Sequence, residues 1–115
     1  MGVSPERATE LALDFEGVSS APHFDRVSFR TTRRIYATLK AEAQDLNLMF
    51  TPDLRDHYCE MAPKAMAPVP GGWGVRGATR CDLALIEEDV LRSALAAAYA
   101  LALPAPPKLK RGRSD

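Results

Sequence analysis

RVSFRTTRRIYATLKAEAQDLNLMF, residues 26–50, is the stretch that decides the fold. Apolar residues alternate with polar ones in three short segments, at 27–29, 35–39 and 46–50. A repeat of two residues is typical of a strand with one buried face, whereas an amphipathic helix repeats every 3.6 residues. Strands joined by connections this short run antiparallel, because parallel pairs need long crossovers. The stretch therefore predicts a three-stranded antiparallel meander.

Helix signals lie on both sides of this meander. Residues 4–6, Ser-Pro-Glu, combine a capping hydroxyl, a proline suited to the first helical position and an acid near the positive end of the dipole. Apolar residues then recur at helical spacing and predict a helix over 5–15. Residues 51–53, Thr-Pro-Asp, repeat the pattern and predict a short helix over 52–61. A final helix is predicted over 87–104, because acidic residues begin it and a proline ends it.

The remaining segments complete the predicted domain. The proline-rich segment 63–70 is at best an edge strand, since proline cannot donate to a central ladder. Residues 79–83 alternate again and predict one more strand. We therefore expect one α+β domain over residues 1–104, an antiparallel sheet with helices packed on one face. Residues 105–115 are rich in proline and basic side chains and are predicted to form a disordered tail.

Composition excludes several classes of protein. The chain has 115 residues, and its 15 basic residues balance 15 acidic ones, so no overall field attracts nucleic acid or a membrane. Cys59 and Cys81 are too few and too isolated for a disulfide framework or a four-ligand zinc site. A single bridge between them is the alternative to the two buried free thiols that we expect. The longest apolar run, 94–103, is half the length of about 20 residues that spans a bilayer. These features predict a cytoplasmic protein with no membrane partner.

The glycine-rich stretch GGWGVRG, residues 71–77, contains the spacing G-x-G-x-x-G. A dinucleotide-binding loop with that spacing follows a strand and begins a helix, so that free amides face the pyrophosphate. Here a poor strand, Pro-Val-Pro at 68–70, precedes the glycines, and residues 78–83 alternate like a strand after them. The pattern therefore predicts a tight turn around an exposed or half-buried Trp73, and no nucleotide cofactor.

The candidates for catalysis and metal binding are weak. His57 and Cys59 stand two apart on a predicted helix, so their side chains diverge and do not share an ion easily. No acidic or histidine cluster has the spacing of metal ligands. A dyad of Cys81 with His23 or His57 is an alternative that the sequence leaves open, but nothing in the sequence prepares either cysteine as a thiolate of low pKa, and structural cysteines are expected. We predict no catalytic residue, no metal site and no cofactor. An enzyme would require a pocket with convergent polar groups near His23, Tyr36 and Trp73.

Arginines beside two connections are the most suggestive residues. Residues 24–40 carry five basic side chains and one acidic one, and further arginines flank the loop after Trp73. If the two connections lie side by side, they form paired basic loops with an aromatic residue between them, a geometry suited to phosphate contacts. The alternative is a solvated face whose arginines pair with nearby carboxylates. The candidate nucleic-acid-binding residues are Arg30, Arg33, Arg34, Trp73, Arg76 and Arg80.

The alanine-rich run near the C-terminus favours an alternative function. Residues 94–103 are apolar on all sides, which is typical of a helix that is buried on several faces or contacts another chain. The small side chains permit close approach. The alternative hypothesis is therefore a protein–protein interaction module or a homodimer formed through residues 90–103.

Several short motifs occur in a familiar order along residues 4–104. They are Gly17, Pro22-His23-Phe24, Phe29, Ile35-Tyr36-Ala37, Leu46 and Leu48, the short helix after Pro52, Gly72-Trp73-Gly74, and a final helix with Tyr99. In this order they resemble the MmcQ/YjbR family. The resemblance implies a two-layer CyaY-like fold similar to that of frataxin, and weak DNA binding through a double-wing arrangement of basic loops without catalysis. Frataxin-type iron binding is not implied, because Arg7 interrupts the acidic residues of the first helix.

Overall fold

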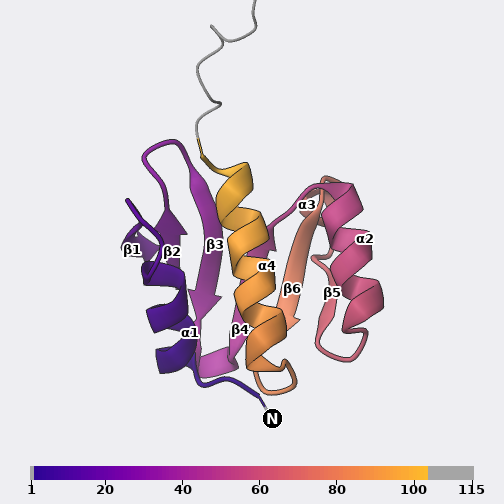
Figure 1. The fold of residues 1–115 in the computed structure, drawn as a ribbon. Coiled ribbons are helices and arrows are strands. Elements are labelled where there is room, and N and C mark those ends of the chain that lie inside the picture. The colour runs from indigo at the N-terminus through magenta and orange to yellow at the C-terminus, as the bar shows by residue number, and fades with distance from the viewer. Residues whose placement is uncertain (1, 104–115) are drawn as a thin grey trace, which may run out of the picture.

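The computed structural model contains a six-stranded antiparallel sheet that three helices cover on one face (Figure 1). The structure describes residues 2–103, and the tail predicted at 105–115 lies outside the described residues. The strand order is β1-β2-β3-β4-β6-β5, and every neighbouring pair is antiparallel. The strands are β1 (Ser19–His23), β2 (Arg26–Arg30), β3 (Ile35–Lys40), β4 (Asp45–Met49), β5 (Met66–Pro68) and β6 (Ala78–Asp82). The α+β class predicted from the sequence is confirmed.

The helices begin where the capping signals predict. In α1 (Pro5–Leu13) the Ser4 hydroxyl accepts a hydrogen bond from the Arg7 amide at 3.1 Å. In α2 (Pro52–Met61) the Thr51 hydroxyl accepts one from the Leu54 amide at 3.3 Å. These bonds satisfy amides that have no partner inside the helix. The remaining helices are α3 (Gly72–Val75), α4 (Glu88–Leu101) and a 3₁₀ turn at Ala41–Ala43.

The core lies between the sheet and the row formed by α1, α4 and α2 (Figure 1). Leu46 and Leu48 of β4 alternate into this core, as the sequence pattern predicts. Helix α4 buries Leu91, Ala94, Leu95 and Ala98 against the sheet. The apolar run near the C-terminus is therefore used within the chain, and its alanines let α4 pack closely on the strands. The homodimer through residues 90–103 stays a prediction.

Strand β3 departs from the strict alternation expected of residues 35–39. The β2–β3 register shifts so that Phe29 pairs with Ala37 and Arg30 pairs with Ile35, which leaves Tyr36 as an extra residue in a β-bulge. The bulge turns Tyr36 into the core, where its hydroxyl donates a hydrogen bond to the Ala12 carbonyl of α1. Burial raises the pKa of this hydroxyl above its ordinary value. Tyr36 is thus a core residue and does not face the same space as Trp73.

The edges of the sheet are both proline-containing strands. The proline-rich segment predicted as an edge strand is β5, which pairs only with β6. The opposite edge is β1, which the sequence pattern missed because Ser19–His23 does not alternate and four of its five residues are exposed. Proline at an edge removes a donor from the unpaired rim of a sheet and discourages pairing with other chains. Within residues 2–103 no helix has the length and apolar character needed to cross a bilayer.

Candidate functional site

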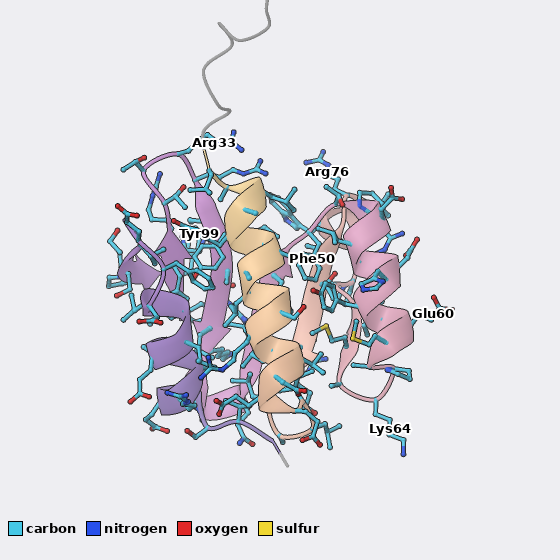
Figure 2. The ribbon with its side chains drawn as sticks, in the orientation of Figure 1. Arg33, Phe50, Glu60, Lys64, Arg76 and Tyr99 are labelled. Atoms are coloured by element: carbon cyan, nitrogen blue, oxygen red, sulfur yellow. The ribbon has the colours of Figure 1, made fainter. Side chains whose placement is uncertain are left out.

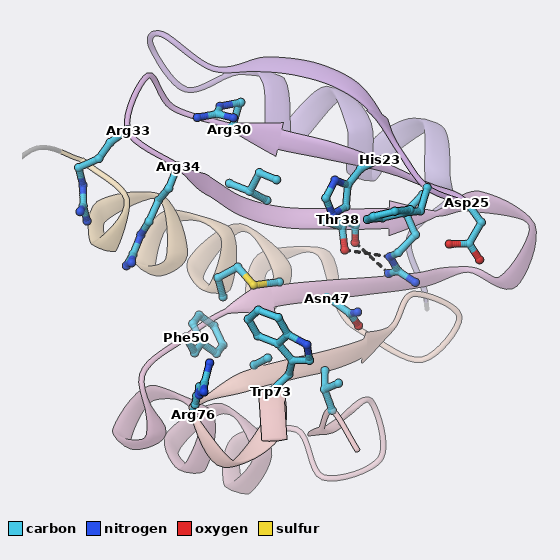
Figure 3. Close-up of a pocket in the computed structure, with 16 residues that line it drawn as sticks. His23, Asp25, Arg30, Arg33, Arg34, Thr38, Asn47, Phe50, Trp73 and Arg76 are labelled. Atoms are coloured by element: carbon cyan, nitrogen blue, oxygen red, sulfur yellow. Dashed lines mark hydrogen bonds between the residues drawn. The ribbon is translucent and has the colours of Figure 1, made fainter. Parts of the chain in front are cut away.

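A groove of about 870 Å³ lies on the open face of the sheet, opposite α1, α2 and α4 (Figure 3). Its position follows from the alternation of β4, because Asn47 and Met49 line the groove while Leu46 and Leu48 point into the core. The floor between the strands is largely apolar. The apolar residues that line the groove include Ile35, Met49, Phe50, Val69 and Ala78.

Four arginines gather at one end of this groove. Arg30 ends β2, Arg33 and Arg34 belong to the β2–β3 connection, and Arg76 follows α3. Figure 3 shows all four at the same end of the groove, and Figure 2 shows Arg33 and Arg76 at the same end of the molecule. All four are exposed, and none forms a salt bridge with a carboxylate among residues 2–103. This end of the groove, the arginine end, therefore carries positive charge without a protein counterion in the described chain.

The arginine end is anchored to the C-terminus of α4. The guanidinium groups of Arg33 and Arg34 both donate to the Leu101 carbonyl, at 2.7 and 3.3 Å, and the Thr31 hydroxyl donates to the Ala102 carbonyl at 2.7 Å. Cations are stabilised at a helix C-terminus, where carbonyls lack partners inside the helix. A guanidinium has five N–H donors, so each of these arginines keeps most of its donors for a ligand. The connection is therefore held in place without being neutralised.

Trp73 projects toward the groove from α3 and is 65% exposed (Figure 3). The Arg76 guanidinium carbon lies 5.8 Å from the centroid of its ring, within the range of a cation–π contact. Arg55 of α2 fixes α3 from behind, by donating to the Gly74 carbonyl at 2.7 Å. The indole is thus displayed from a short, tethered turn of helix.

The glycine pattern around Trp73 has a packing explanation. A Cβ at Gly74 would collide with the Val69 backbone, and a Cβ at Gly77, whose φ is +121°, would collide with the Phe50 carbonyl. Gly72 has open space around it. Two of the three glycines therefore permit the close approach that places α3 beside the groove, which agrees with the tight turn predicted from the sequence.

The opposite end of the groove is formed by the tip of the β1–β2 hairpin. His23 pairs with Arg26, so Phe24 and Asp25 make the two-residue tip. Phe24 has a φ of +60° and is 93% exposed, and its ring meets the His23 ring edge-on at 4.9 Å. A hydrogen bond from Lys40 at 3.0 Å lowers the pKa of Asp25. This end carries a carboxylate that is already paired.

Arg26 and Arg80 differ from the arginines of the arginine end. Arg26 donates to the Thr38 hydroxyl and to the Asp45 carboxylate, at 2.8 and 3.2 Å. Arg80 lies on the open face but does not line the groove, and its Nε donates to the other Asp45 oxygen at 3.2 Å. Of the six candidate residues, Arg30, Arg33, Arg34, Trp73 and Arg76 therefore come together, whereas Arg80 is held in a carboxylate pair.

Sequence reasoning missed Phe24 and Asn47 as residues of the groove. Asn47 lines the floor, and its side-chain oxygen is buried without a hydrogen-bond partner in the described part of the chain. The alternation that places Leu46 and Leu48 in the core could have placed Asn47 on the opposite face. No local signal indicates the place of Phe24. Its exposure depends on the β1–β2 hairpin, and the residues of β1 show no alternation that would predict a strand.

The cysteine, histidine and acidic side chains within residues 2–103 are the remaining candidates for metal binding or for a reactive thiol. No group of three or more histidine, cysteine or acidic side chains within residues 2–103 is arranged to hold a metal ion. Both cysteines have free thiols. Burial raises the pKa of the Cys81 thiol to about 12, and burial also raises the pKa of Cys59. Neither thiol has the lowered pKa of a reactive nucleophile.

Two solved structures resemble this chain in fold. The crystal structure of protein DR2400 from Deinococcus radiodurans, which has a DUF419 domain, matches with a TM-score of 0.71 at 15% identity, over 96% of this chain and 82% of that one. The crystal structure of a Pseudomonas syringae protein matches with a TM-score of 0.64 at 13% identity, over 88% of this chain and 100% of that one. No family model and no curated protein matches the sequence. At these identities the likeness shows the fold alone.

Proposed function

We propose that this chain is a DNA-binding protein of the MmcQ/YjbR type, which binds phosphates weakly through the arginine end of the groove. The order of short motifs and the two-layer fold support the family. The arrangement of the arginines supports the function, and it is the observation that carries the proposal. Four exposed guanidinium groups without a carboxylate partner in the described chain line the same groove as an exposed indole.

The chemistry of the arginine end favours phosphate over other anions on a macromolecule. Guanidinium donors are planar and match phosphate oxygens in pairs, and phosphate contacts supply most of the affinity of sequence-independent DNA binding. The overall neutral charge limits long-range attraction, so binding is expected to be weak and local. Arg33 and Arg34 are oriented by α4 before any ligand arrives, which lowers the entropy lost on binding.

The test is a titration of labelled DNA, in single-stranded and duplex forms, at several salt concentrations. Four phosphate contacts predict a slope of about −3 in a plot of log affinity against log salt. The double substitution Arg30→Ala with Arg76→Ala should reduce the magnitude of that slope by nearly two, because each contact contributes nearly one. Arg33 and Arg34 are left intact in this variant because both contact α4.

A matched control removes an arginine from the other side of the sheet. Arg92 lies on α4, is exposed and pairs with Glu88 at 3.4 Å, so Arg92→Ala removes one positive charge away from the groove and matches either single variant, Arg30→Ala or Arg76→Ala. This control should keep the affinity and slope of the unsubstituted protein. Absence of binding to either form of DNA at low salt, or equal slopes for the double variant and the control, would remove the proposal.

A further inference from the structure

We propose that the groove binds single-stranded DNA, with bases stacked on Trp73 and Phe24 and phosphates at the arginine end. This inference rests on the proposed function and names the form of DNA. It starts from the division of the groove into an apolar floor and a charged end. The floor includes Ile35, Met49 and Ala78, whereas the four guanidinium groups that have no carboxylate partner in the described chain lie at one end.

A single strand matches this division better than a double helix does. A duplex presents phosphates outward and keeps its bases stacked inside, so an apolar hollow gains little from it. Reading base edges in a duplex requires an element that enters a groove of the DNA. A hollow instead accepts bases that have left their stack, while the strand's phosphates stay within reach of the arginines. The volume, about 870 Å³, is in the range of sites for small ligands, which suits a few unpaired nucleotides.

Two aromatic side chains line the groove and are largely exposed. Trp73 is 65% exposed on α3, and Phe24 is 93% exposed at the tip of the β1–β2 hairpin. Stacking of bases on such rings tolerates any sequence, because every base has a π face. The Arg76 guanidinium beside the Trp73 ring places a phosphate donor next to a stacking surface. This combination of aromatic rings and cations is the usual chemistry of single-strand binding.

Phe24 supplies the sharpest argument, because folding does not explain it. It is the first residue of a two-residue hairpin tip, with a φ of +60°, a position where glycine, asparagine or aspartate is usual. A side chain in the left-handed region destabilises the fold, and an exposed phenylalanine gains little burial in return. A strained residue that lines a groove points to a role in binding. Phe24 is therefore assigned to base stacking.

The substitution Phe24→Gly separates stability from binding. Glycine adopts the positive φ without strain, so the variant should unfold at an equal or higher temperature than the unsubstituted protein. Loss of one stacking surface should nevertheless weaken binding of a single-stranded oligo(dT) of about 15 nucleotides by about tenfold. Trp73→Ala should weaken it by a similar factor. Leu85→Ala, which removes an exposed apolar side chain away from the groove, should leave it unchanged.

A second measurement uses the fluorescence of Trp73, the single tryptophan of the chain. Stacking of a base on the indole should quench this fluorescence when single-stranded oligo(dT) is added, and a duplex of equal length should quench it less and bind more weakly. Duplex binding equal to or tighter than single-strand binding, or unchanged affinity in both Phe24→Gly and Trp73→Ala, would overturn the inference and leave phosphate binding standing. Absence of binding to both forms at low salt would remove the proposed function itself.

Discussion

The two faces of the sheet differ in how far their side chains are buried, and neighbouring residues on β4 show the difference. Leu48 is fully buried under the helices, whereas Met49, the next residue, is only partly buried on the groove. The covered face is apolar and closely packed, so folding alone accounts for its residues. The open face combines apolar side chains with arginines that lack carboxylate partners in the described chain and with a strained Phe24. The features that folding does not explain therefore lie on the open face, where the proposed site is.

The largest expected effect compares these two neighbours directly. Leu48→Ala should lower the free energy of unfolding by about 3–5 kcal/mol, because it opens a cavity in the core. Met49→Ala should lower it by about 1 kcal/mol, since this side chain is already partly exposed on the groove. Urea denaturation with a common m-value measures both. An equally large cost for Met49→Ala would mean that the open face is covered in solution.

The next effect tests whether the glycines hold α3 beside the groove. Gly74→Ala should lower the free energy of unfolding by about 3 kcal/mol, because the added methyl group meets the Val69 backbone. Gly72→Ala should be neutral or stabilise by up to about 1 kcal/mol, since its surroundings are open and alanine favours a helix. Thermal unfolding of the two variants decides the matter. Equal effects would contradict the packing explanation of the pattern.

The sequence predicted what depends on local physics. The two Ser/Thr-Pro-acid signals located the starts of α1 and α2, and alternation located β2, β3 and β4. Strand β1 was not predicted, because its exposed residues do not alternate between apolar and polar. What defines it as a strand is its pairing with β2, which is a tertiary contact. The burial of Tyr36 was not predicted, because a β-bulge reverses the direction of its side chain.

The candidate site was predicted only in part for a similar reason. Charge and aromatic content indicated the arginines and Trp73, but the strand order brings them together, since β4 lies between β3 and β6. The same strand order pairs Arg80 with Asn47 of β4. Arg80 can therefore donate to the nearby Asp45 carboxylate, and it does not join the arginine end. The spacing of residues along the chain does not predict that the Asp45 carboxylate accepts hydrogen bonds from arginines on two different strands.

A third prediction compares two arginines on β2. Arg26 makes four hydrogen bonds, to Thr38 and Asp45, and Arg26→Ala should lower the free energy of unfolding by about 2 kcal/mol, because it leaves the Asp45 carboxylate short of partners. Within residues 2–103 the Arg30 side chain donates only to the neighbouring Thr31 carbonyl, and Arg30→Ala should change the free energy of unfolding by less than about 0.5 kcal/mol. Urea denaturation gives both values. A larger loss of stability for Arg30→Ala than for Arg26→Ala would mean that Arg30 stabilises the fold, and it would weaken the proposal of a ligand at the arginine end.

The smallest effect concerns Glu88, which lies at the start of α4 on the helical side of the molecule. Arg7 donates to both oxygens of this carboxylate, at 3.3 and 3.0 Å, and these bonds lower its pKa below the ordinary 4.5. A lowered pKa in the folded state means that the folded protein binds this proton less readily than the unfolded chain does. The resulting stability is present above pH 4.5 and is lost as the pH falls through the lowered pKa.

Glu88→Gln isolates this contribution, because every other carboxylate titrates in both proteins. The unsubstituted protein should have the higher urea midpoint at pH 7, and the difference should shrink as the pH falls below 4.5 and through the lowered pKa of Glu88. The effect should be small, since the pair is partly exposed and screened by solvent. A difference that stays constant with pH would show that the glutamine alters packing and not charge. The arginine end has no carboxylate partner in the described chain, so Arg30→Ala should show no such dependence over the same range. This contrast would separate an ion pair that stabilises the fold from arginines that the fold does not need.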